Sequence, residues 1–319
     1  MATEMSRQIV TPGKAGGGWS RFFAVVRRTG QFPWIPVIFL APLFIFGIFG
    51  PWMYPHNPHT IDLSQALQPP GFAGGRWSFF LGTDQMGRDL LSLIMEGARA
   101  SLVVAFFGVV FSGIVGIGLG SIAGYFGGKI DSIIMRIVDA WMAIPNLFLV
   151  LMLVAVMRQV HLTGLVPIII ALAVTMWVPY AAIARGEILK TRQTDYVRLA
   201  RVTGCGNGRI MVRHIWPNVT NSLVVVATVQ LGTAVMAEAG MSFLGVGVQP
   251  PSTAWGLLIS QSMTYMQSAW WVPTFAGIAI TITVLGANLL GDWLRDTLDP
   301  TLRRTARRGD EKAEVTCDE

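Results

Sequence analysis

The chain carries little charge for its length. Only 13% of its 319 residues are charged, whereas 52% are apolar. A soluble domain has roughly 25% charged residues, so the two soluble domains that this length suggests would lack polar residues to cover their surfaces. Glycine and tryptophan, which are enriched in membrane-spanning helices, number 35 and 11. The composition therefore predicts a membrane protein that crosses the bilayer several times.

The residues needed for common kinds of active site are also scarce or absent. Two cysteines, Cys205 and Cys317, are too few for a disulfide framework or a four-ligand zinc site. The four histidines have no partner at metal-ligand spacing, and no Ser/His/Asp set lies in a plausible pocket. No segment matches the phosphate-binding loop G-x-x-x-x-G-K-S/T, because Ile130 follows the nearest Gly-Gly-Lys run. The sequence thus predicts no catalytic residue, no metal and no cofactor.

Stretches without charged residues predict six membrane-spanning helices, because a bilayer core needs about 20 apolar helical residues. Their ranges are about residues 35–53, 101–125, 140–157, 165–184, 222–239 and 271–290. The uncharged segment after Glu238 is too long for one helix, and the turn-rich residues 245–253 divide it. We therefore expect an all-α membrane protein, with an uncharged loop around residues 240–269 that packs on the membrane face or beneath a partner.

The distribution of Lys and Arg predicts the orientation of the chain in the membrane. Twenty of the 24 lie before the first span, in the link after the second span, in residues 185–221 or in the C-terminal tail. The other four are Arg76, Arg88, Arg99 and Arg158. Both termini are therefore expected in the cytosol, and the net charge of +6 reflects orientation rather than the binding of nucleic acid.

This orientation divides the chain into five parts. They are a cytosolic N-terminal segment (1–34), a first transmembrane helix (35–54), an external loop (55–100), a transmembrane core (101–293) that includes a cytosolic loop (185–221), and a cytosolic tail (294–319). The long loops are the places where function is expected, because long loops in a compact protein are usually functional.

Two groups of residues are predicted to have structural roles. In the external loop, four polar residues are expected to cap and pin a short helix: Thr83, Asp84, Arg88 and Asp89. In the second span, small residues recur every four positions and predict a close helix contact: Ser112, Gly116, Gly120 and Gly124. The pattern leaves open whether the contacting helix belongs to the same subunit or to a partner.

The cytosolic loop is predicted to contain a short amphipathic helix. Asp195 is a suitable N-cap for it, and Gly204 is a suitable residue just past its end. Its weakly apolar face, with Arg198 and Arg201 beside it, consists of Tyr196, Leu199, Ala200 and Thr203. A nine-residue helix is marginal alone, so it needs a surface to dock against. On pattern alone, one such surface is anionic lipid.

The same loop resembles a known sequence motif. Residues 195–205 (DYVRLARVTGC) and 215–218 (IWPN) are similar to the "EAA" loop of binding-protein-dependent ABC importer permeases. That motif reads Glu-Ala-Ala, three residues, Gly, and then a downstream Ile-x-Leu-Pro. Further segments resemble the C-type subunit of the dipeptide/oligopeptide/nickel permease family: residues 81–92 (LGTDQMGRDLLS), 135–139 (MRIVD), 242–251 (SFLGVGVQPP) and 288–300 (NLLGDWLRDTLDP). The resemblance extends over roughly residues 81–303.

The resemblance implies a type I ABC importer permease fold in the cell inner membrane, in which the short helix is a coupling helix that docks on an ATPase. The implied partners are a second, homologous permease subunit (a heterodimer), two cytosolic ABC ATPase subunits, an external substrate-binding protein and membrane lipid, with no nucleic acid. The expected coupling residues are Tyr196, Val197, Arg198, Leu199, Ala200, Arg201, Thr203, Gly204, Ile215 and Pro217. The family's Glu falls on Arg198, its first Ala on Leu199 and its Leu before Pro on Trp216.

The substrate stays open at this stage. A permease for di- or oligopeptides is expected, and nickel or another small solute of the same family is the alternative. Glu238, near the outer end of the fifth span, is a possible contact on the substrate path, because ionisable groups at membrane depth are usually functional. A secondary transporter would require acids in the middle of spans, and a membrane scaffold would require neither a substrate path nor a second permease.

Overall fold

The computed structural model describes residues 33–298, and within that range it contains helices and no β-strand. The α-helices are α2 (Trp34–Met53), α3 (Leu90–Phe126), α4 (Gly128–Met142), α5 (Asn146–Gln159), α6 (Val166–Thr175), α7 (Trp177–Arg192), α8 (Asp195–Val202), α9 (Asn207–Ile210), α10 (Trp216–Phe243), α11 (Trp255–Ser262) and α12 (Trp271–Leu298). A π-helical turn, Met211–Ile215, joins α9 to α10. The expected all-helical fold is confirmed.

Within residues 33–298, five helical runs are long and apolar enough to cross a membrane. They are α2, α3, the run Val166–Arg192 formed by α6 and α7, the run Asn207–Phe243 that ends with α10, and α12. The helices α4 and α5 meet the same test only as a pair, and their axes are bent by 88°. The described part of the chain therefore has five candidate spans, or six if the bent pair is one span.

The bend falls inside the third expected span, residues 140–157, which consists of the end of α4 and most of α5. The helix α4 ends at Met142, and α5 begins directly after Pro145. Proline has no N–H to donate and disfavours helical geometry in the residue before it. Pro145 therefore ends one helix and begins another at a large angle, which the lack of charge across this region could not indicate.

The second span begins earlier than its uncharged stretch suggested. The helix α3 starts at Leu90, because the carboxylate of Asp89 accepts a hydrogen bond from the Ser92 N–H (3.1 Å) and caps it. Just before it, the Asp84 carboxylate accepts from the Arg88 N–H (2.8 Å) and forms an ion pair with the Arg88 guanidinium (2.6 Å). These residues therefore form a turn and cap α3, and the Thr83 hydroxyl donates to the Gln65 carbonyl (2.6 Å) at the end of a short 3-10 helix, Leu63–Gln65.

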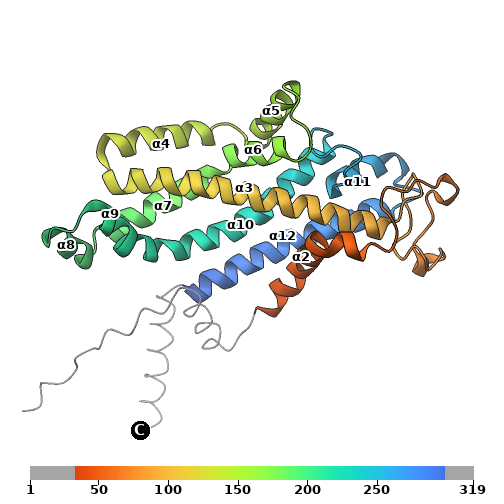
Figure 1. The fold of residues 1–319 in the computed structure, drawn as a ribbon, viewed down its shortest axis with the longest axis horizontal. Coiled ribbons are helices and arrows are strands. Elements are labelled where there is room, and N and C mark those ends of the chain that lie inside the picture. Colours follow the sequence, from red (N-terminus) through yellow and green to blue (C-terminus); the bar gives the residue numbers. More distant parts are fainter. Residues whose placement is uncertain (1–32, 299–319) are drawn as a thin grey trace, which may run out of the picture. The chain divides into compact units, whose positions relative to one another are not determined.

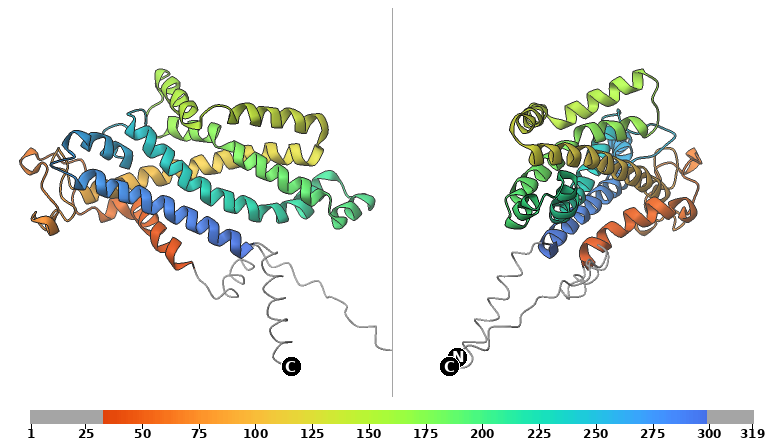
Figure 2. Two further views of the ribbon diagram at one scale, coloured as in Figure 1. Left: turned by 180° about the vertical axis from the view of Figure 1, so that it is seen from behind. Right: turned by 60° about the vertical axis from the view of Figure 1, so that its left-hand side comes forward.

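The helix α3 lies at the centre of the bundle. It contacts α2, α4, α6, α7 and α10, and Figure 1 shows α3, α7 and α10 running side by side. The views in Figure 2 show α12 beside both α10 and α2, and these pairs also contact one another. One end of the bundle carries α8 and α9, and the other carries α11 and the loop after α2 (Figure 1). We call these the α8 end and the α11 end.

The small residues of α3 pack against α7 in the same chain. A Cβ on Gly116 would collide with the Trp177 carbonyl oxygen, and one on Gly120 with the Ala181 carbonyl oxygen. A Cβ on Gly124 would lie 2.9 Å from the Arg185 carbonyl oxygen. The two helix backbones approach each other closely because these positions have no side chain. This answers the question that the spacing left open in favour of a contact within the subunit.

The uncharged loop packs on the helices at the α11 end. Its helix α11 contacts α3, α10 and α12. Trp255 at its start is buried, and its indole N–H donates to the Ile94 carbonyl of α3 (2.9 Å). Gly97 leaves space for this ring, because a Cβ there would lie 2.6 Å from the indole. The loop is therefore held by the bundle itself.

Candidate functional site

The helix α8 begins one residue earlier than its acidic residue suggested. Its N-cap is Thr194, whose carbonyl accepts from the N–H groups of Val197 and Arg198 (3.1 Å each). The expected cap Asp195 is the first residue of the helix. There its carboxylate is favourably placed near the positive end of the helix dipole. Asp195 thus stabilises the helix start through its charge, and its assignment as the N-cap is corrected.

The end of α8 has the geometry expected from its glycine. Gly204 has φ +79°, a left-handed conformation that residues with a Cβ rarely adopt. Its N–H donates to the Arg201 carbonyl, and the Cys205 N–H donates to the Ala200 carbonyl (3.1 Å each). This pair of bonds is the Schellman motif, which ends a helix by turning the chain sharply. Gly204 therefore sets where α8 stops.

The helix α8 is fixed to the bundle through an apolar cluster. Val197 is fully buried, and the other buried members of the cluster are Tyr125, Ile188, Ile210, Ile215 and Val219. Ala200 and Cys205 pack at its edge. These residues come from α3, α7, α8 and the segment that begins α10, so three long helices meet at the base of α8.

Hydrogen bonds join the same elements. The Arg192 guanidinium donates to the Tyr125 carbonyl (2.7 Å), and the Tyr125 hydroxyl donates to Asn207 (2.7 Å). The Asn218 amide donates to the Tyr196 hydroxyl (3.0 Å), which ties α8 to α10. These bonds and the apolar cluster together connect α8 to the ends of α3, α7 and α10.

The exposed face of α8 differs from the expected one. Ala200 turns toward the bundle with Val197, whereas Leu199 and Val202 are 64% and 85% exposed. Each helical residue is rotated by about 100° from the last, so Leu199 and Val202 lie roughly opposite Val197. Sequence reasoning missed Val202. Choosing Val197 as the buried anchor, since it is one of the most apolar residues of this helix, would have revealed the correct face.

Some of the remaining expected coupling residues are buried and others are exposed. Ile215 is fully buried in the cluster, while Pro217 is exposed in the first turn of α10. Arg198, Arg201 and Thr203 are exposed, and Tyr196 is partly exposed although its hydroxyl is engaged by Asn218. Of the ten expected residues, Val197 and Ile215 thus belong to the buried cluster that holds α8 in place. Most of the others form the accessible surface of the helix.

The carboxylate of Glu238 lies far from α8 and is fully buried on α10. Its two oxygens accept hydrogen bonds from the hydroxyls of Ser101 (2.7 Å) and Ser242 (2.8 Å). The Ser242 hydroxyl oxygen in turn accepts from the Val248 N–H (3.1 Å). Glu238 therefore ties α3, α10 and the loop before α11 together, and in this conformation it does not line an open path.

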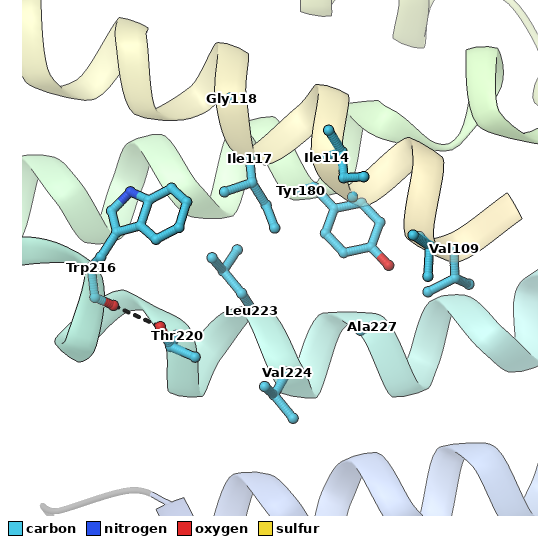
Figure 3. Close-up of a pocket in the computed structure, with 12 residues that line it drawn as sticks. Val109, Ile114, Ile117, Gly118, Tyr180, Trp216, Thr220, Leu223, Val224 and Ala227 are labelled. Carbon is cyan, nitrogen blue, oxygen red and sulfur yellow. Dashed lines mark hydrogen bonds between the residues drawn. The ribbon is translucent and has the colours of Figure 1, made fainter. Parts of the chain in front are cut away.

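An apolar pocket of about 470 Å³ lies between α3, α7 and α10 (Figure 3). Its lining residues are Val109, Val110, Gly113, Ile114, Ile117, Gly118, Tyr180, Trp216, Thr220, Leu223, Val224 and Ala227. None is charged, and Glu238 is not among them. The pocket can therefore hold apolar groups, but it offers no counter-charge to an ionised ligand.

Among residues 33–298, no three His, Cys, Asp or Glu side chains are placed to hold a metal ion.

Comparisons with known proteins agree on one kind of protein. Residues 116–304 match the model of the family described as the binding-protein-dependent transport system inner membrane component. The di/tripeptide transport system permease protein DppC of Pseudomonas aeruginosa is 37% identical over 85% of this chain and 88% of its own length. The dipeptide transport system permease protein DppC of Bacillus subtilis is 36% identical over 82% of this chain and 79% of its own length.

A solved structure shares the fold. It is a chain of the MetNI methionine ABC transporter in an inward-facing conformation, with a TM-score of 0.56 and 20% sequence identity. The match covers 66% of the present chain and 98% of the MetNI chain. At this identity the likeness concerns the fold alone.

Proposed function

Because this chain belongs to the family of binding-protein-dependent transport system inner membrane components, we propose that it is the permease subunit of an ABC importer for di- or oligopeptides. The observation that carries the proposal is a short helix, α8, with an exposed apolar face and a base fixed to three long helices. Relatives over most of the chain are named as dipeptide or di/tripeptide permeases, which favours a peptide substrate.

The proposed orientation follows the distribution of positive charge. The α8 end carries most of the Lys and Arg of the loops, so it faces the cytosol together with both termini. The α11 end then faces outward, where an external substrate-binding protein delivers the peptide. A second, homologous permease completes the pathway, and two cytosolic ATPases bind the coupling helices.

In this mechanism α8 transmits motion and the chain performs no bond chemistry. Closure of the ATPases on nucleotide moves the docked α8, and the cluster around Val197 passes that movement to α3, α7 and α10. Shifting an equilibrium from 1:99 to 99:1 requires about 5.5 kcal/mol of differential binding. The connection between α8 and the long helices must therefore be rigid. The hydrogen bonds of Tyr125, Tyr196 and Arg192 contribute to that rigidity.

The proposal predicts that an uncharged change of the exposed face of α8 uncouples the ATPases. The double variant Leu199→Asn, Val202→Asn places two amides in an apolar contact, which costs about 1–3 kcal/mol for each group left unsatisfied. We expect peptide-stimulated ATP hydrolysis in proteoliposomes to fall at least about tenfold.

The matched control changes two exposed apolar residues at the other end of the bundle. Ile61→Asn with Leu63→Asn alters side chains of similar size and exposure in the loop after α2. This variant should retain its bound ATPase subunits. If the α8 variant also kept its ATPase subunits and showed the same stimulation by peptide as the wild type, the proposed role of the helix would be contradicted.

A further inference from the structure

The α8 end has more basic residues than partners within the chain that could pair with them. Residues 185–221 contain seven basic residues and two acidic ones. Arg185 pairs with Asp131, and Arg192 donates to the Tyr125 carbonyl. The acidic Glu187 accepts a hydrogen bond from Ser222 (3.1 Å). These groups are satisfied within the chain, so they are not the ones that a partner must match.

Part of the remaining positive charge lies on the accessible surface of α8 and α9. Arg198, Arg201 and Arg209 are exposed, and none of them forms an ion pair with another residue of the described range 33–298. The one carboxylate on α8 is Asp195 at its start. The free surface of this helix therefore has a net positive charge.

Arg198 borders the apolar face that the proposed docking would cover. It precedes Leu199 and is rotated by about 100° from it around the helix axis. When a partner covers Leu199 and Val202, Arg198 lies at the edge of the contact and loses part of its water. Removing water from a guanidinium is costly unless acceptors replace it, and a carboxylate matches the planar guanidinium with two parallel hydrogen bonds.

The direction of this face favours a protein partner over lipid. Val197 faces the ends of the long helices, so Leu199 and Val202, on the opposite side of α8, point away from them. Figure 1 shows α8 at the far end of the bundle, past the end of α3. A helix that lies on a bilayer turns its apolar face into the lipid. Here the apolar face is directed away from the spanning helices.

From these placements we infer that the surface of the ATPase that receives α8 is an acidic groove, in which a carboxylate pairs with Arg198. The inference rests on the proposed function, since it names the chemistry of the surface on which the coupling helix docks. The position that is Glu in the related motif is Arg198 in this chain. The permease and its ATPase are thus matched by charge as well as by shape, and an ATPase with a basic groove is a poor partner for it.

The test uses the assembled transporter in phosphatidylcholine nanodiscs. The variants are Arg198→Glu and the neutral Arg198→Gln, and the control is Arg76→Glu, an exposed arginine in the loop after α2. Retention of the ATPase subunits is measured against salt concentration. We expect wild-type retention to weaken with salt, Arg198→Glu to weaken affinity about tenfold or more, Arg198→Gln to lie between, and Arg76→Glu to match wild type.

A second measurement keeps the result independent of any folding defect. Single Asp or Glu→Arg variants of the ATPase groove are combined with Arg198→Glu, and at least one combination should restore retention and peptide-stimulated hydrolysis. Full retention by Arg198→Glu, or the absence of any restoring partner variant, would overturn the inference.

Two further outcomes separate the alternatives. A difference between wild type and Arg198→Glu that arises only when phosphatidylglycerol is added, with ATPase retention unchanged, would assign Arg198 to lipid and overturn the acidic groove. If wild type itself binds no ATPase in any condition, the proposed function fails. If wild type binds and the charge reversal at Arg198 has no effect, the acidic groove alone fails.

Discussion

Replacing Gly116 by Ala is expected to destabilise the folded protein by about 1–3 kcal/mol or more, because it inserts a methyl group into a backbone contact. The new Cβ would collide with the Trp177 carbonyl oxygen and would lie 2.6 Å from the Tyr180 Cβ. Neither neighbour is the flexible end of a side chain, so α3 and α7 must separate to make room. The loss is read as a fall in the melting temperature of the purified protein.

Gly186→Ala is the matched control for this prediction. Gly186 is also in a helix, on an exposed part of α7, and a Cβ there meets nothing within 4 Å. Alanine is favoured over glycine in a helix by up to about 1 kcal/mol. The control should therefore be neutral or slightly stabilising. Equal melting temperatures for the two variants would mean that α3 and α7 do not pack through Gly116.

The second large effect is expected at Glu238, where two substitutions should behave differently. Glu238→Ala leaves the hydroxyls of Ser101 and Ser242 without their acceptor and opens a cavity, at a combined cost of about 2–5 kcal/mol. Glu238→Gln keeps the shape, since its amide can accept from one hydroxyl and donate to the other. We therefore expect the Ala variant to lose stability, while the Gln variant keeps most of its stability and its peptide uptake.

Uptake in the Glu238→Gln variant distinguishes a structural carboxylate from one used in transport. A group that ties α3 to α10 and to the loop before α11 needs hydrogen bonds more than it needs a charge. A substrate contact, or a carboxylate that couples transport to protons or sodium, needs the ionisable group itself. A stable Glu238→Gln protein that no longer takes up peptide would contradict the structural assignment.

The fold class and the end of α8 could be predicted from the sequence, because each depends on residues that are close together in the chain. An uncharged run marks a span because charge is costly in lipid. Gly204 marks the end of α8 because the left-handed conformation there favours glycine. The spacing of Gly116 and Gly120 marks a close helix contact because small residues let two backbones approach. The family and its partners came from the resemblance and not from these patterns.

Three features could not be predicted, because they depend on packing between different helices: the exposed face of α8, the bend at Pro145 and the partners of Glu238. The face that α8 exposes is decided by Val197, which is buried among residues of other helices, α3, α7 and the segment that begins α10. The 88° bend at Pro145 depends on where α5 packs, since a proline interrupts a helix without fixing the new direction. The serine partners of Glu238 are 137 residues before it and four residues after it, so only the folded chain brings all three together.

The most direct test of the account is photo-crosslinking in intact cells from position 202, the most exposed apolar residue of α8. A photoreactive amino acid replaces Val202, and the proteins joined to it on illumination are identified. The account predicts an adduct with an ATPase subunit that changes in yield when ATP hydrolysis is blocked. Adducts only with proteins outside the cytosol, or none with a nucleotide-hydrolysing protein while peptide uptake persists, would contradict it.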